Sequence, residues 1–138
     1  MSGEEQRGTM TFAVFHGSPR KGNTYKATAV FMDELRKKGN LHISEFFLPE
    51  AIPKFCTGCQ ICLGGPHEGC PHSQYVTPVL SAILDADALV FTTPHLGACS
   101  MSGCMKNLLD HLDFLTLNVA PRSVVFTKKA FVPFAQTS

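Results

Sequence analysis

The sequence lacks several features that mark particular classes of protein. It has no tryptophan and two tyrosines, and its 138 residues carry a formal net charge of only +1. Lysines and arginines are scattered, so no basic patch indicates binding to nucleic acid or to an acidic membrane surface. No apolar run is long enough to span a bilayer, and the N-terminus has no signal-peptide pattern. We therefore expect a cytoplasmic protein that binds neither nucleic acid nor membranes.

The apolar content sets the number of domains. With 44% hydrophobic residues, the chain can build one core, but it is too short for two. We expect one domain over residues 1–138. Its six cysteines, without a secretion signal, favour free thiols or metal ligands over disulfides.

Apolar runs of strand length alternate with segments of helical periodicity. The expected strands are residues 10–15, 41–48, 88–92 and 130–135. One helix ends near Gly39, a second begins with Thr77 as cap and Pro78 at its first position, and a third begins near Ser102. Pro133 inside the last strand indicates a sheet edge. This order predicts a parallel, doubly wound α/β sheet in a three-layer α/β/α arrangement.

The loop after the first strand has the composition of an anion site. Gly17–Thr24 precedes a helix, whose free N–H groups and dipole favour a negative charge. Ser18, Asn23 and Thr24 can donate hydrogen bonds, and Arg20 adds a positive charge. The loop lacks the motifs of triphosphate and dinucleotide sites, which favours a monophosphate. The alternative is an ordinary turn in which Asn23 or Thr24 caps the helix.

A cysteine-rich loop at residues 55–72 is the second candidate site. Its cysteines follow the pattern C-x2-C-x2-C-x7-C and are Cys56, Cys59, Cys62 and Cys70. The first three have a spacing that suits a cubane [4Fe-4S] cluster. Zinc held by the thiolates with His67 or His72, and thiols that only pack the loop, are the alternatives. Cys99 and Cys104 are expected to be packed thiols.

Four segments together resemble the NAD(P)H-dependent FMN reductase and iron-sulfur flavoprotein superfamily. They are residues 17–24, 55–62, 86–94 and 100–110. The resemblance implies a flavodoxin-like fold, FMN on the phosphate loop and NAD(P)H as cosubstrate. A flavin accepts hydride at its own N5 and needs no side-chain acid or base, so we name no catalytic residue.

The resemblance also implies that the loop after the third expected strand approaches the flavin ring. That loop contains Pro94, His95, Leu96 and Gly97. The family usually has a tyrosine where this chain has Leu96, and His95 is a candidate replacement for the aromatic contact. The arginine that commonly follows the aspartate of the next helix is His111 here.

The expected function is an FMN-dependent oxidoreductase that moves electrons from NAD(P)H through bound flavin to an unknown small-molecule acceptor. One alternative is an iron-sulfur flavoprotein that uses a [4Fe-4S] cluster and FMN with ferredoxin-type partners. Another is a non-catalytic or zinc-binding remnant.

The remnant alternative arises from the strand count. A flavodoxin-like sheet has five strands, whereas four are counted here, so we expect a domain truncated at its C-terminus. Phe131, Val132 and Phe134 would then form an exposed apolar edge unless another chain or a missing segment covers them. The alternatives are dimerisation and an incomplete product that folds poorly. The resemblance implies the first, because the family generally works as oligomers, and we expect a homo-oligomer.

Overall fold

The computed structural model describes residues 8–64, 69–95, 100–112 and 130–136. In chain order the elements are β1 Met10–His16, α1 Asn23–Arg36, β2 Leu41–Phe47, α2 Leu48–Ala51, α3 Ile61–Gly64, α4 Ser73–Asp85, β3 Ala88–Pro94, α5 Gly103–His111 and β4 Ala130–Gln136. The predictions made for His67, Leu96, Gly97 and Cys99 lie outside the described residues.

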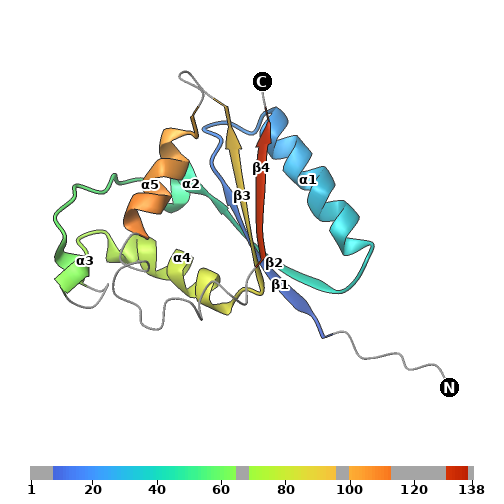
Figure 1. The fold of residues 1–138 in the computed structure, drawn as a ribbon, viewed down its shortest axis with the longest axis horizontal. Helices are drawn as coiled ribbons and strands as arrows, with labels where there is room; N and C mark the ends of the chain where they lie inside the picture. The colour runs from blue at the N-terminus through green and yellow to red at the C-terminus, as the bar shows by residue number, and fades with distance from the viewer. Residues whose placement is uncertain (1–7, 65–68, 96–99, 113–129, 137–138) are drawn as a thin grey trace.

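The four predicted strands form one parallel sheet in the order β2-β1-β3-β4. The sequence prediction of a doubly wound parallel sheet is therefore confirmed. β4 lies at an edge of the described sheet, beside β3, as Pro133 within it indicated. Figure 1 shows α1 on one side of the sheet and α2, α4 and α5 on the other, which confirms the three layers.

Alternate residues of β1 supply two separate cores, because successive side chains of a strand point to opposite faces. Phe12 and Val14 pack with Met32 of α1. Ala13 and Phe15 pack on the opposite face with α2, α4 and α5. The ring of Phe15 stacks between Phe46 of β2 and Phe91 of β3, at centroid distances of 5.5 and 5.3 Å.

The start of α4 differs from the prediction. The helix begins at Ser73, so Pro78 lies inside it, and Thr77 is not its cap. The reason is tertiary: Val76, in the turn before the proline, is buried in the core with Val79. Burial of a valine side chain is worth about 1.5–3 kcal/mol, which offsets much of the cost of a proline within the helix.

The segment after β2 is also more regular than predicted. It contains two one-turn helices, α2 and α3, where no periodicity indicated a helix. Leu48 and Ile52 anchor the first of these in the core. Among the helices that the structure describes, none is long and apolar enough to cross a membrane.

Candidate functional site

The carboxyl ends of β1 and β3 meet at the centre of the sheet. From β1 the chain continues to β2 on one side, whereas β3 pairs with β1 on the other side. In open α/β sheets, ligands bind at such a reversal of strand order. The phosphate loop predicted from the sequence follows β1 at this point.

Gly17 holds that loop directly against β3. Its N–H donates to the carbonyl oxygen of Thr92 over 2.8 Å. A Cβ atom at this position would lie 2.9 Å from the same oxygen and 3.0 Å from Oγ of Ser102 and from Cε of Met105. No side chain fits there without movement of the backbone.

Ser102 joins the phosphate loop to the loop after β3. Its Oγ donates to the carbonyl oxygen of Gly17 over 2.5 Å and accepts from the N–H of Met105 over 3.2 Å, which caps α5. Its own N–H donates to Oγ1 of Thr93 over 2.9 Å. One buried serine therefore fixes both loops and the start of α5.

The predicted phosphate ligands differ in exposure. Ser18 and Thr24 are buried, whereas Arg20 and Asn23 are exposed. Oγ of Ser18 donates to the carbonyl oxygen of Arg20 and accepts from the N–H of Arg20 over 3.3 Å, so it shapes the turn.

The N-terminus of α1 has no side-chain cap. Gly22 is the N-cap residue, and the first turn contains no acidic residue. The alternative in which Asn23 or Thr24 caps the helix is therefore wrong. The first N–H groups of α1 lack a side-chain acceptor from the helix cap, and an anion can accept from them.

On the other side of the predicted site, Pro94 is buried at the end of β3 and His95 is exposed. Both lie at the carboxyl end of the sheet, on the loop predicted to approach the flavin ring.

The four cysteines of the predicted metal site line a single pocket. They share it with His72, Asp110 and His111. Burial raises the pKa of the Cys62 thiol, and the charge of Cys70 raises it further. The protonated form of Cys62 is therefore favoured.

Although the cysteines share this pocket, they do not form a ready metal site. Within the ranges that the structure describes, no three His, Cys, Asp or Glu side chains are arranged to hold a metal ion. The sequence predicted that a cluster or zinc is bound by Cys56, Cys59, Cys62 and Cys70. Among the described residues, these cysteines do not form such a site.

Comparison with known proteins decides the family. Residues 10–138 match the model of the NADPH-dependent FMN reductase family. The chain belongs to this family. As a member, it is an NAD(P)H-dependent oxidoreductase with a flavodoxin-like fold. No match was found among curated proteins.

Solved structures share the fold of this FMN reductase family member at low sequence identity. Azoreductase AzrA aligns with a TM-score of 0.72 and 15% identity, over 93% of this chain and 69% of AzrA. An NAD(P)H:quinone oxidoreductase from Methanothermobacter marburgensis aligns with a TM-score of 0.66 and 14% identity, over 94% of this chain and 85% of that chain. An FMN-dependent NADH-azoreductase from Bacillus anthracis, solved with FMN, gives 0.60 and 13%, over 94% and 69%.

Sequence reasoning missed two residues that organise this family member's site. Ser102 was recognised only as the start of a helix. Asn107, on α5, is buried and was not recognised at all. Its side chain donates to the carbonyl oxygens of Ile52 and Lys54 over 3.3 and 3.0 Å and accepts from the N–H of Cys56 over 3.0 Å. It fixes the start of the cysteine loop.

Asn107 lies one helical turn before His111. Two polar residues at this spacing, beside the apolar stripe of the helix, are the signal in the sequence from which Asn107 could have been recognised. Nδ1 of His111 contacts the carbonyl oxygen of Asn107 over 2.9 Å, and Nε2 contacts Nδ1 of His72 over 3.0 Å. Burial lowers the pKa of His111. The neutral imidazole is therefore favoured in the lining of the cysteine pocket.

Proposed function

We propose that the chain binds FMN at the carboxyl ends of β1 and β3 and uses NAD(P)H to reduce a small-molecule acceptor. The observation that carries this proposal is the uncapped N-terminus of α1, which follows a loop that Gly17 holds against β3 at a position with no room for a side chain. Family membership supports the same cofactor. A neighbouring structure also contains FMN.

The phosphate group would be bound by the N–H groups at the start of α1 and by the polar residues of the loop. Ser18 and Thr24 are buried, whereas Asn23 and Arg20 are exposed. Charge-assisted hydrogen bonds of this kind are roughly twice as strong as neutral ones. This arrangement favours FMN over an unphosphorylated flavin.

The ring would lie against the loop of Pro94, His95, Leu96 and Gly97. Bound FMN supplies a hydride-accepting N5, so the chain itself must orient the ring and exclude water. Buried Pro94 fixes the start of this loop, and Ser102 fixes its end through Thr93. We assign no catalytic acid or base.

The iron-sulfur flavoprotein is the second candidate function, because all four cysteines of the motif line one pocket. The described residues do not form a ready metal site, so we derive no electron-transfer step through a cluster. Anaerobic reconstitution with iron and sulfide, followed by desalting and metal analysis, tests it. Four iron atoms and four sulfides per chain would support this candidate, whose expected partners are ferredoxin-type proteins. A metal-free protein would refute it.

The FMN proposal is tested by titrating FMN with the protein and following quenching of flavin fluorescence. Substitution of both Arg20 and Asn23 by alanine should weaken binding about tenfold or more, because a charged and a polar phosphate contact are lost. The exposed pair Arg36 and Lys37, at the other end of α1, provides a matched control whose replacement by alanine should leave binding unchanged.

Two results would contradict the FMN proposal. One is a wild-type protein that fails to bind FMN. The other is a protein with bound FMN whose absorbance does not bleach when NADH or NADPH is added without oxygen.

A further inference from the structure

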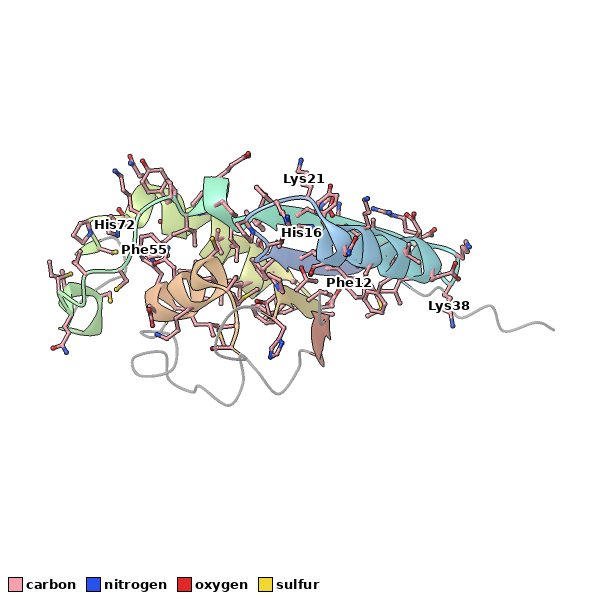
Figure 2. The ribbon with its side chains drawn as sticks, turned by 90° about the horizontal axis from the view of Figure 1, so that it is seen from above. Phe12, His16, Lys21, Lys38, Phe55 and His72 are labelled. Atoms are coloured by element: carbon pink, nitrogen blue, oxygen red, sulfur yellow. The ribbon has the colours of Figure 1, made fainter. Side chains whose placement is uncertain are left out.

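His16 is a buried polar side chain that the proposed function does not yet use. It ends β1, directly before Gly17, and its side chain is only 4% exposed. Its ring centroid lies 4.9 Å from that of Tyr25, which is in the first turn of α1. Figure 2 shows His16 beside the start of α1 and well separated from His72. The imidazole therefore lies next to the helix end that is proposed to bind phosphate.

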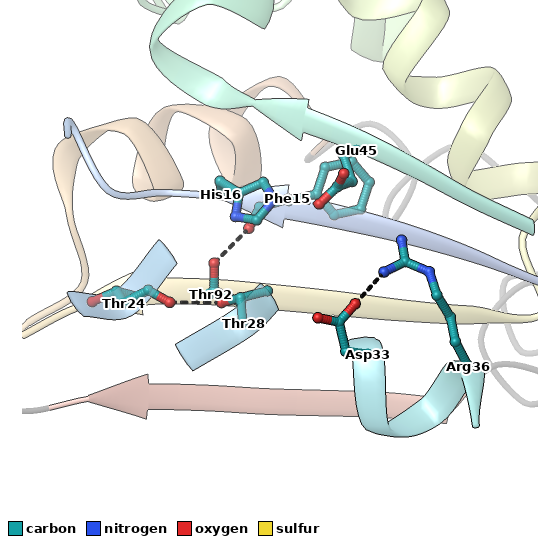
Figure 3. A network of polar contacts seen from close by, with 8 residues as sticks. All are labelled: Phe15, His16, Thr24, Thr28, Asp33, Arg36, Glu45 and Thr92. Atoms are coloured by element: carbon teal, nitrogen blue, oxygen red, sulfur yellow. Dashed lines mark hydrogen bonds and ion pairs between the residues drawn. The ribbon is translucent and has the colours of Figure 1, made fainter. Parts of the chain in front are cut away.

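Glu45 orients this imidazole from the neighbouring strand. Nε2 of His16 lies 3.1 Å from Oε1 of Glu45, and the two side chains lie side by side in Figure 3. Glu45 breaks the apolar alternation of β2, since Leu41 and Ile43 on the same face pack into the α1-side core. An ionised carboxylate can only accept hydrogen bonds, so Nε2 of His16 carries the proton.

The other ring nitrogen has no partner. Within the part of the chain that the structure describes, Nδ1 of His16 is the one buried side-chain nitrogen or oxygen atom without a hydrogen-bond partner. Leaving such a group unsatisfied costs about 1–3 kcal/mol, so each case calls for an explanation. A ligand atom at the start of α1 provides one.

We infer that His16 donates a hydrogen bond from Nδ1 to the phosphate of FMN, while Glu45 fixes the ring through Nε2. This inference rests on the proposed FMN function and adds His16 to the residues that would bind the phosphate. Each of the two nitrogens of an imidazole ring can donate a hydrogen bond when it bears a hydrogen, so one ring can bridge the carboxylate of Glu45 and the phosphate. The uncapped N–H groups of α1 are donors too, so the position between them suits an anion. His16 thereby helps the site to select a phosphorylated flavin over riboflavin.

The test compares the dissociation constants of FMN and riboflavin, measured by fluorescence quenching. His16→Phe should weaken FMN binding about tenfold or more, because one charge-assisted hydrogen bond is lost, and should leave riboflavin binding unchanged. Glu45→Gln keeps an acceptor but removes the charge, and should weaken FMN binding severalfold. His42→Gln, at an exposed histidine of β2, is the control and should change neither constant.

The Glu45 variant keeps the test decisive if His16→Phe fails to fold, because the Glu45 side chain is about half exposed at 49%. Circular dichroism checks the fold of each variant. Equal losses for FMN and riboflavin would overturn the phosphate contact, as would unchanged FMN binding in both variants. If the wild type itself does not bind FMN, the proposed function fails and the role of His16 fails with it. If the wild type binds FMN and both variants bind it with the same dissociation constant, the role of His16 is refuted and the proposed function stands.

Discussion

Gly17 is a residue whose lack of a side chain is required by the fold. Gly17→Ala places a Cβ atom within 2.9 Å of a backbone oxygen of β3, which cannot swing aside as a side chain can. We expect a loss of about 1–3 kcal/mol in the free energy of unfolding, as for other overpacked sites, together with weaker FMN binding. Urea unfolding followed by circular dichroism measures the first quantity.

Gly39→Ala is the control for this substitution, since a Cβ atom at Gly39 would meet no atom within 4 Å. A Gly17 variant as stable as the Gly39 variant would show that the loop can move away from β3.

At the residue scale, the sequence predicted best what depends on neighbours in the chain. The phosphate loop was recognised because its glycines, hydroxyls and following helix are contiguous. The pairing of His16 with Glu45 was not predictable in this way, since the partners are 29 positions apart on different strands. The bonds from Asn107 to the backbone near Cys56 span more than 50 positions. Such partners become neighbours only through the register of the sheet and the packing of α5.

At the scale of elements, α5 depends on the cap that Ser102 provides. Ser102→Ala removes the acceptor for the N–H of Met105 and the donor to the carbonyl oxygen of Gly17. Loss of an N-cap typically costs about 0.5–2 kcal/mol. We expect a loss in that range or above it, together with weaker FMN binding, because the phosphate loop loses its contact with α5.

Ser81→Ala, at an exposed position within α4, is the matched control and should change stability little. Thermal unfolding and FMN titration of both variants measure these effects. If the Ser102 variant lost stability but kept full FMN affinity, Ser102 would support α5 without shaping the phosphate loop.

The elements themselves were largely predictable, because buried parallel strands appear as short apolar runs. All four strands lie where such runs predicted them, within one or two residues at their ends. The start of α4 was not predictable from local signals, since a proline with a preceding threonine normally marks a helix start. Burial of Val76 overrides that signal. The one-turn helices α2 and α3 are too short to show a period.

At the scale of the whole molecule, the edge strand β4 leads to a prediction about assembly. In the described sheet, β4 pairs with β3 on one side, and its other side is an edge. Edge strands present backbone N–H and C=O groups that can pair with a second chain. We propose that the protein forms a homo-oligomer through this side of the sheet.

Light scattering coupled to gel filtration should give a mass of about twice the monomer's 15.0 kDa or a higher multiple. Val132→Lys, which puts a charge in the middle of β4, should shift the protein toward the monomer. The same substitution at exposed Val30 on α1 is the control and should leave the mass unchanged. A monomeric wild-type protein would contradict this prediction.

The position of α5 has a further consequence for how mutations combine. Ser102 at its start holds the phosphate loop, and Asn107 holds the cysteine loop. The two residues are five positions apart, or about 7.5 Å along the helix axis. Because one short helix carries both contacts, we expect a displacement at one loop to be transmitted to the other. Substitutions in the two loops should therefore be epistatic, and neither loop should evolve independently of the other.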